Sequence, residues 1–266
     1  MVLKRIITGL ALGVFAGVII WLGDPWFTIA ICLASALATF EFYRIVRYEH
    51  IQPLVFPGIF FSILFVLQVH SPFPETCALL FVLIILLPLI WMLFKQEKDN
   101  AFINVGWTIM GILYIGWLLS FYINTRNLEN GMGWTFLILT CTALCDVFAY
   151  AVGSRLGKHA LASSVSPGKT VEGSLGGMAA SIIFAVLISI LFKLPLSYWQ
   201  MVLAGIIIGV FAQIGDLVES LLKRNMKTKD AGNILPGHGG ILDRIDSHLL
   251  ISPVAYFLIL FISKQG

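Results

Sequence analysis

Residues 199–222 read WQMVLAGIIIGVFAQIGDLVESLL, and this stretch decides how the chain has to fold. At a rise of 1.5 Å per residue, a helix of this length spans about 36 Å, which exceeds the roughly 30 Å hydrocarbon core of a bilayer. The next residues, 223–246, read KRNMKTKDAGNILPGHGGILDRID and belong to the densest cluster of charge in the chain. The two segments together predict a membrane-spanning helix that leads into a polar loop at the membrane surface.

Similar apolar runs recur along the whole chain. Of the 266 residues, 59% are hydrophobic and only 12% are charged, and the mean hydropathy is +0.94. A soluble domain carries about 25% charged residues. We therefore predict an all-α polytopic integral membrane protein with about nine transmembrane helices. The predicted spans are about 5–22, 26–43, 53–70, 75–94, 103–123, 133–152, 174–192, 199–222 and 245–263. The first is expected to be retained, because it has no small-residue cleavage site of the kind that ends a signal peptide.

Basic residues are distributed unevenly between the two sides of the predicted membrane protein. With nine helices, the N-terminus and the loops after even-numbered spans share one side, which holds 14 of the 17 lysine and arginine residues. Cytoplasmic loops carry such an excess of positive charge. We therefore expect a cytoplasmic N-terminus, two charged cytoplasmic loops, and a location in the cell (inner) membrane.

Small residues at four-residue spacing mark two predicted packing faces. One stripe is Gly9, Gly13 and Gly17 on the first helix, and the other is Gly205 and Gly209 on the eighth. Such stripes let helix backbones approach closely. Whether they pack within one chain or across a homodimer stays open. The four cysteines show no ligand or pairing pattern, so we expect neither a metal site nor a disulfide from them.

The first charged loop contains residues suited to binding phosphate. Its segment Ser166-Pro167-Gly168-Lys169-Thr170 resembles the end of a P-loop, but the required earlier glycine is replaced by Ser163 and the preceding segment is a membrane helix. The P-loop interpretation therefore fails. A lysine with neighbouring hydroxyl and backbone donors remains, and it predicts phosphate contacts from Ser166, Lys169 and Thr170.

Acidic residues within the predicted spans indicate a cation site. Asp216 lies seven residues before the basic end of its helix, roughly 10 Å below the membrane surface. A carboxylate buried in a bilayer costs about 2.5–3.5 kcal/mol, so it should face a polar cavity or a bound cation. Asp243 and Asp246 lie three residues apart at the start of the last helix. We predict that Asp216, Asp243 and Asp246 share Mg²⁺, with Asp146 and Glu219 as further candidate ligands.

The second charged loop supplies cations and flexible backbone. We predict that it binds phosphate groups through Lys223, Arg224, Lys229, His238, Gly239, Gly240 and Arg244. Lysine and arginine pair with phosphate oxygens, and glycine lets the backbone approach a ligand closely. The role of His238 stays open between acid–base catalysis and hydrogen bonding to phosphate or backbone.

At these residues the chain resembles the phosphatidate cytidylyltransferases, also called CDP-diacylglycerol synthases. Their signature extends over residues 220–246 of this chain. The matching residues are Ser220, Lys223, Arg224, Lys229, Asp230, Pro236, His238, Gly239, Gly240, Asp243, Arg244 and Asp246. The upstream segments Ser166–Gly173 and Gly215–Ser220 also look like the family. The resemblance implies that CTP and phosphatidic acid give CDP-diacylglycerol and pyrophosphate, with Mg²⁺ as cofactor and Asp216, Asp243, Asp246 and Lys169 as catalytic residues.

The matches leave the first 130 residues without a recognised motif. We therefore divide the chain into an N-terminal transmembrane region, 1–130, and a C-terminal catalytic transmembrane region, 131–266, whose site faces the cytoplasm. The expected partners are CTP, phosphatidic acid and membrane lipids, with no nucleic acid.

Two other classes of protein remain alternatives. One is a different membrane enzyme, such as a CTP-dependent polyprenol kinase or a cytidylyltransferase for an ether lipid. The other is a secondary transporter that uses Asp146, Asp216 and Glu219 for ion coupling. The crowding of polar residues at the cytoplasmic helix ends favours an enzyme over a transporter.

Overall fold

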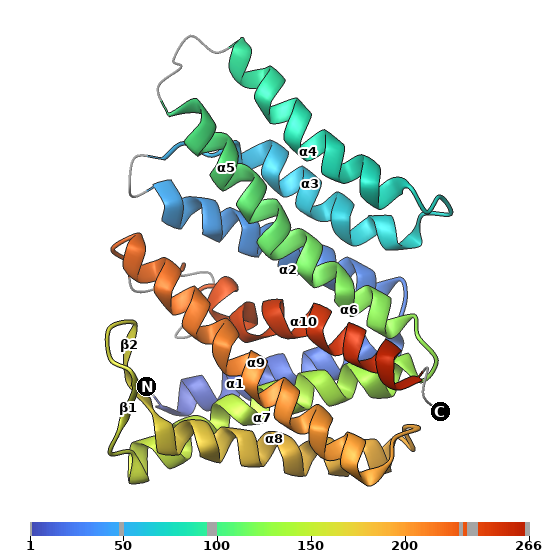
Figure 1. The fold of residues 1–266 in the computed structure, drawn as a ribbon, viewed down its shortest axis with the longest axis vertical. Coiled ribbons are helices and arrows are strands. Elements are labelled where there is room, and N and C mark those ends of the chain that lie inside the picture. Colours follow the sequence, from blue (N-terminus) through green and yellow to red (C-terminus); the bar gives the residue numbers. More distant parts are fainter. Residues whose placement is uncertain (1, 48–50, 95–99, 229–230, 233–238, 264–266) are drawn as a thin grey trace. The chain divides into compact units, whose positions relative to one another are not determined.

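The described part of the chain is mostly helical (Figure 1). The computed structural model describes residues 2–47, 51–94, 100–228, 231–232 and 239–263. The helices are α1 Val2–Leu22, α2 Trp26–Val46, α3 Val55–Leu67 with the 3₁₀ turn η2 Gln68–His70, α4 Thr76–Leu93, α5 Ala101–Gly111 with the π-helical segment η3 Ile112–Trp117 and α6 Leu118–Arg126, α7 Gly131–Leu156, α8 Val171–Leu191, α9 Tyr198–Asn225 and α10 Leu242–Ser263.

Every predicted span coincides with a helical segment of the structure. Within the described ranges, seven segments are long and apolar enough to cross a membrane: 26–46, 76–93, 101–126, 131–156, 171–191, 198–225 and 242–263. Two further apolar segments are shorter: Ala11–Leu22, which is part of α1, and Val55–His70, which comprises α3 and η2. The prediction of a helical, multi-pass membrane protein is confirmed, and the count of nine crossings stays a prediction.

One element of the structure is absent from the sequence prediction. A short antiparallel hairpin, β1 Ala160–Ala162 and β2 Ser166–Thr170, connects α7 to α8. Ala160 lies opposite Thr170, and Ala162 lies opposite Ser166. The hairpin follows the end of one membrane helix and runs directly into the next, so the Ser166–Thr170 segment lies between the end of α7 and the start of α8.

The chain forms two compact units that do not follow sequence order. Unit 1 contains Met1–Ile123 and Asn225–Arg244, and unit 2 contains Asn124–Arg224 and Ile245–Gly266. The described residues of the glycine-rich second loop therefore belong with the N-terminal helices. Helix α10 begins in unit 1 and continues in unit 2. The predicted division of the chain into 1–130 and 131–266 is a functional one and stays a prediction.

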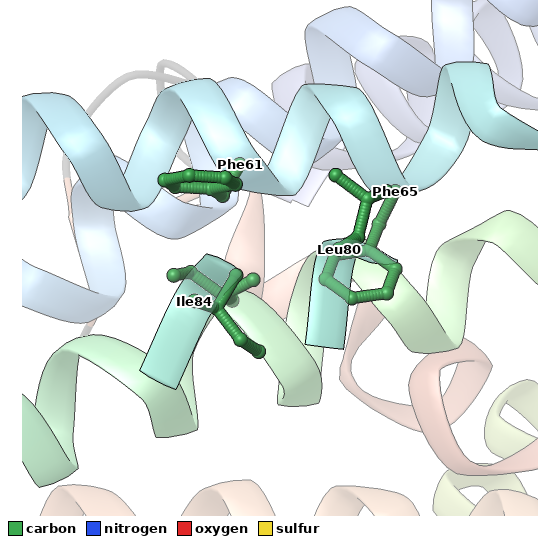
Figure 2. Close-up of a cluster of buried hydrophobic side chains, with 5 residues drawn as sticks. Phe61, Phe65, Leu80 and Ile84 are labelled. Atoms are coloured by element: carbon green, nitrogen blue, oxygen red, sulfur yellow. The ribbon is translucent and has the colours of Figure 1, made fainter. Parts of the chain in front are cut away.

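Unit 1 is held together by aromatic and branched side chains packed between helices. Phe61 and Phe65 of α3 meet Leu80 and Ile84 of α4, as Figure 2 shows, and Ile112 of η3 completes the cluster. All five are buried. Because lipid tails are as apolar as these side chains, the close van der Waals fit is what favours packing between helices.

Tyr43 fixes α2 against its neighbours in unit 1. Its ring fills the space left by two glycines, because a Cβ on Gly58 or Gly111 would overlap the ring. The Tyr43 hydroxyl donates a hydrogen bond of 2.6 Å to the carbonyl oxygen of Thr108. This end of α2 is therefore locked to α3 and α5.

In unit 2, α7 and α8 pack together along much of their length, and α9 packs on α8 through small residues. A Cβ on Gly205 would lie 2.5 Å from the Cα of Ile182, and the Ser181 hydroxyl donates a hydrogen bond of 2.8 Å to the Gly205 carbonyl. The glycine stripe of this helix thus packs within one chain. By contrast, no described atom lies within 4 Å of a Cβ built on Gly13 of α1.

Candidate active site

A lysine of the hairpin forms an ion pair with an acidic residue of α9 within unit 2. Lys169 lies on β2, and its Nζ is 2.5 Å from Oδ2 of Asp216 on α9. Both side chains are about a quarter to a third exposed, so the pair is neither fully solvated nor sealed off. The structure thus brings together one predicted phosphate ligand and one predicted metal ligand.

The residues that flank Lys169 connect the hairpin to α8. Thr170 is the N-cap of α8, and its Oγ1 accepts a hydrogen bond of 3.1 Å from the Gly173 backbone. This contact satisfies one of the N–H groups that a helix start leaves without an intrahelical partner. Ser166 begins β2 and is half-buried. Thr170 therefore has a structural role in addition to its predicted phosphate contact.

Glu172 fixes the other side of the same turn. Its Oε2 accepts hydrogen bonds from the backbone N–H groups of Lys158, at 3.0 Å, and His159, at 3.2 Å. Its Oε1 lies 2.6 Å from Nδ1 of His159. The carboxylate therefore joins the end of α7 to the start of α8 and closes the base of the hairpin.

Two predicted phosphate-binding cations lie at the end of α9. Lys223 forms an ion pair with Glu219, one helical turn earlier, and Glu219 is fully buried. Arg224 is exposed, and its Nε donates a hydrogen bond of 3.3 Å to the Val165 carbonyl in the hairpin. The end of α9 and the hairpin are thus held together, with basic groups on both.

A glycine allows α9 and α10 to approach closely at the predicted acidic site. A Cβ on Gly215 would lie 2.8 Å from the carbonyl oxygen of Asp246 and 3.0 Å from the Cα of Ser247. The buried Asp246 carboxylate accepts a 2.8 Å hydrogen bond from the Ser247 backbone. The Ser247 hydroxyl donates to Oδ2 of Asp146 on α7 at 3.3 Å. Gly215 therefore sets the distance between Asp216 and the start of α10.

Four carboxylates of unit 2 form one electrostatic group. Asp246 lies within electrostatic range of Asp216, Glu219 and Asp146. The ammonium groups of Lys169 and Lys223 meet two of these carboxylates. We call these six residues the lysine–carboxylate cluster. Its net charge of −2, with all six groups ionised, favours a cation, and its basic groups favour an anion.

The donor atoms of this cluster suit Mg²⁺, which prefers hard oxygen ligands. In the part of the chain that the structure describes, no three histidine, cysteine, aspartate or glutamate side chains are grouped closely enough to hold a metal ion by themselves. Mg²⁺ is commonly bound by one or two carboxylates together with substrate phosphates and water. The donor atoms are therefore of the kind that Mg²⁺ uses, and Mg²⁺ binding stays a prediction.

The second group of site residues lies in unit 1, around the start of α10. Oδ2 of Asp243 accepts backbone hydrogen bonds from Gly240, at 2.8 Å, and Ala231, at 3.1 Å. Gly239 has a φ of +81°, which a side chain would strain, and a Cβ there would lie 2.7 Å from the same oxygen. Asp243 thus joins the two described ends of the glycine-rich loop.

Glu41 of α2 is a member of this second group that sequence reasoning missed. Its side chain is 1% exposed, and its Oε2 accepts a hydrogen bond of 2.8 Å from the backbone N–H of Leu242, the first residue of α10. A Cβ on Gly232 or on Gly240 would overlap the carboxylate. We call Glu41, Gly232, Gly240, Leu242 and Asp243 the loop cluster. A signal existed, because Glu41 is an acidic residue within an otherwise apolar span.

The remaining predicted site residues can be placed only in part. Arg244 is exposed in the first turn of α10. Lys229 and His238 lie outside the described residues.

Comparison with known proteins adds the family. The sequence matches the cytidylyltransferase family over residues 3–262, nearly the whole chain. The chain belongs to the cytidylyltransferase family. A phosphatidate cytidylyltransferase of Bacillus subtilis (strain 168) is 35% identical over 268 residues, which cover 98% of each chain.

Other relatives agree with this assignment. A phosphatidate cytidylyltransferase of Synechocystis sp. is 31% identical over 97% of each chain. One of Staphylococcus haemolyticus (strain JCSC1435) is 36% identical over 165 residues, which cover 62% of this chain and 63% of the relative. The prediction of a nucleotidyltransferase enzyme is confirmed, and the alternative of a secondary transporter is not supported.

Proposed function

We propose that this protein transfers the cytidylyl group of CTP to phosphatidic acid and releases pyrophosphate. The observation that carries the proposal is the match over 98% of the chain to a relative named phosphatidate cytidylyltransferase. The structure adds support, because basic and acidic groups of the predicted site meet in the lysine–carboxylate cluster.

The reaction makes modest demands on the protein. An oxygen of the lipid phosphate attacks the α-phosphorus of CTP, the bond from that phosphorus to the bridging oxygen breaks, and the electron pair leaves with pyrophosphate. The nucleophile is already an anion, so no strong general base is needed. Catalysis then consists of aligning two anionic reactants and neutralising the charge that moves onto the leaving group.

The chain's own residues can supply that alignment and neutralisation. We propose that Lys169 and Lys223 exchange their carboxylate partners for phosphate oxygens when the substrates bind. Arg224 and Arg244 are exposed and add further cationic donors. Hydroxyl, histidine and backbone donors in the two loops complete the proposed phosphate site: Ser166, Thr170, Lys229, His238, Gly239 and Gly240.

We propose Mg²⁺ as the cofactor, held by Asp216 and Asp246, with Asp146 and Glu219 as further candidate ligands. When bound, the ion would neutralise phosphate charge that the lysines alone leave uncompensated. Asp243 is proposed as a ligand from the sequence pattern, although its described contacts are with backbone N–H groups.

We also propose nine membrane crossings, with the N-terminus and the site on the cytoplasmic side. The support is the uneven distribution of basic residues, 14 of 17 on one side of the predicted topology. A reporter fused after Gly266 should be found outside the cytoplasm, and one inserted near His159 should be found inside. Finding both reporters on the same side would exclude this topology.

The function itself is tested with CTP labelled at two positions. Purified protein, Mg²⁺ and phosphatidic acid should move an α-phosphorus label into the lipid and a γ-phosphorus label into pyrophosphate. A γ-label in the lipid would show a kinase. Turnover with an ether lipid in place of phosphatidic acid would show the other membrane cytidylyltransferase, and no turnover with either lipid would overturn the proposal.

A further inference from the structure

We infer that Glu41 is a positioning residue for the reaction: its buried carboxylate holds the described ends of the glycine-rich loop and the first turn of α10 in place. The inference rests on the proposed function for its consequence, although the contact itself is a property of the fold. It assigns a role to the N-terminal half of the chain, where the sequence shows no recognised motif.

The first support is the environment of the carboxylate. Glu41 lies near the end of a membrane-length apolar helix and is almost completely buried. A charged group in such a place is costly unless other groups hydrogen-bond to it. Its Oε2 accepts a hydrogen bond from the N–H of Leu242, one of the groups that the start of α10 leaves without an intrahelical partner. Oε2 and the helix start therefore satisfy each other, whereas the buried Oε1 has no hydrogen-bond partner among the described residues.

The second support is the shape of the loop. Gly232 and Gly240 flank the carboxylate so closely that a Cβ on either would overlap its oxygens. These two glycines come from the two described ends of the loop, 231–232 and 239–242. Two separate stretches of described backbone thus lie directly against Glu41. We infer that the Gly240 position serves this contact, whether or not its backbone also meets a phosphate.

The third support is the rigidity of the supporting helix. Phe42 and Tyr43 follow Glu41 and are completely or almost completely buried. Tyr43 is locked by Gly58, Gly111 and the Thr108 carbonyl. The part of α2 that carries Glu41 is therefore held firmly in place, which a residue that positions others requires.

The consequence falls on residues that the proposed reaction uses. Leu242 is followed directly by Asp243 and Arg244, and Asp246 lies on the same helix one turn later. A displacement of about 1 Å at a reacting group can cost about 10²-fold in rate. Loss of the Glu41 contact should therefore lower kcat without removing any group that touches a substrate.

The first experiment replaces Glu41 by residues of similar length. Glu41→Met removes the hydrogen-bond acceptor for Leu242, but a methionine suits an apolar helix. If Glu41 served only to build α2, the protein should therefore tolerate this change. We expect kcat to fall about 10²-fold in Glu41→Met and to stay within about tenfold of wild type in Glu41→Gln, which keeps one acceptor oxygen. Glu75→Gln, at an exposed carboxylate before α4 in the same unit, is the matched control and should leave kcat unchanged.

A double-mutant cycle tests the contact itself. Gly240→Ala should lower kcat about 10²-fold in the wild-type background, because the new methyl group overlaps the Glu41 carboxylate. In a Glu41→Ala background the space is free, so the same change should cost less than about threefold. Gly106→Ala, where a Cβ meets nothing within 4 Å, is the control glycine. If the reductions in kcat caused by Glu41→Ala and Gly240→Ala simply multiplied in the double variant, the two residues would act independently and the inference would be overturned.

A third measurement separates this inference from the proposed function. Hydrogen exchange of a peptide that covers residues 239–244 should be faster in Glu41→Met than in wild type, and close to wild type in Glu41→Gln. This readout does not depend on substrates. Inactivity of the wild-type protein with CTP and phosphatidic acid would overturn the proposed function, whereas unchanged exchange in Glu41→Met would overturn the role of Glu41.

Discussion

The lysine–carboxylate cluster and the loop cluster use the same chemical groups in different ways. In the first, carboxylates meet the ammonium groups of Lys169 and Lys223, which are side chains that can turn toward another partner. In the second, Glu41 and Asp243 meet backbone N–H groups, whose positions are set by the fold. An anionic substrate can displace a carboxylate from a lysine, but it cannot free a backbone donor without moving the loop.

The difference separates binding from positioning within one signature sequence. Lys223 is paired with a carboxylate that a phosphate could replace, and Asp246 lies near other carboxylates, whereas Asp243 accepts a hydrogen bond from the Gly240 backbone in the loop. Acidic residues three positions apart in the sequence therefore have different surroundings.

Asp216→Asn and Asp246→Asn should each lower kcat by about 10²- to 10³-fold, because each removes a charge from the lysine–carboxylate cluster at which transition-state charge is balanced. The measurement is steady-state turnover of labelled CTP across a range of Mg²⁺ concentrations. Glu129→Gln, at an exposed carboxylate of the same unit, is the control. Near-normal turnover of either variant at limiting Mg²⁺ would mean that the residue is not a ligand.

Gly215→Ala should lower kcat about 10²-fold, because the new Cβ meets backbone atoms of α10 that cannot turn aside. Overpacking of this kind also costs about 1–3 kcal/mol of stability, which thermal unfolding in detergent would detect. Gly106→Ala again supplies the control. Wild-type activity in Gly215→Ala would show that the close approach of α9 and α10 is dispensable.

Asp243→Asn should lower kcat by about tenfold or more and should raise the Mg²⁺ concentration that gives half-maximal activity, if its carboxylate is a ligand as well as a loop acceptor. The measurement is an Mg²⁺ titration beside that of Asp246→Asn. A loss of kcat with an unchanged Mg²⁺ dependence would place Asp243 in the loop cluster alone and would sharpen the contrast with Asp246.

Glu172→Gln should have the smallest effect, because an exposed ion pair is screened by solvent. We expect the free energy of unfolding to fall by no more than about 1 kcal/mol and kcat to fall no more than a few-fold. The residue joins the base of the hairpin but does not belong to either cluster. Thermal unfolding and turnover at low and high salt would measure both effects. A loss as large as that of Asp246→Asn would mean that the hairpin itself, rather than Lys169 on it, controls the site.

Much of the helical architecture could be predicted from the sequence, because long apolar runs leave the backbone few alternatives in a membrane. The start of α2 at Trp26 and the end of α10 at Ser263 agree with the predicted spans 26–43 and 245–263. The hairpin was missed, because its strands are short and follow no alternating apolar pattern. The π-helical segment Ile112–Trp117 likewise has no distinct signal in an apolar run.

The two clusters were predictable to different degrees. Asp216 and Glu219 were found because acidic residues in an apolar span are costly, and the same reasoning applied to Glu41 would have marked it. That reasoning would not have identified the hydrogen-bond partner of Glu41, because Leu242 lies 201 residues away and donates through its backbone. Contacts to a backbone N–H leave no trace in residue type at the donor position.

The contact between Glu41 and two glycines has a consequence for how this enzyme can change by mutation. The side chain at position 41 occupies the space that a side chain at position 232 or 240 would need. The sizes of these residues are therefore coupled, although about two hundred positions separate them in the chain. A larger residue at either glycine requires a smaller one at position 41, and the intermediate sequence with both large is obstructed. Chimeras that exchange only the first 123 residues with a relative will therefore inherit one half of a fitted pair. Their activity should depend on whether the donor sequence carries a residue of glutamate's size and hydrogen-bonding capacity at that position.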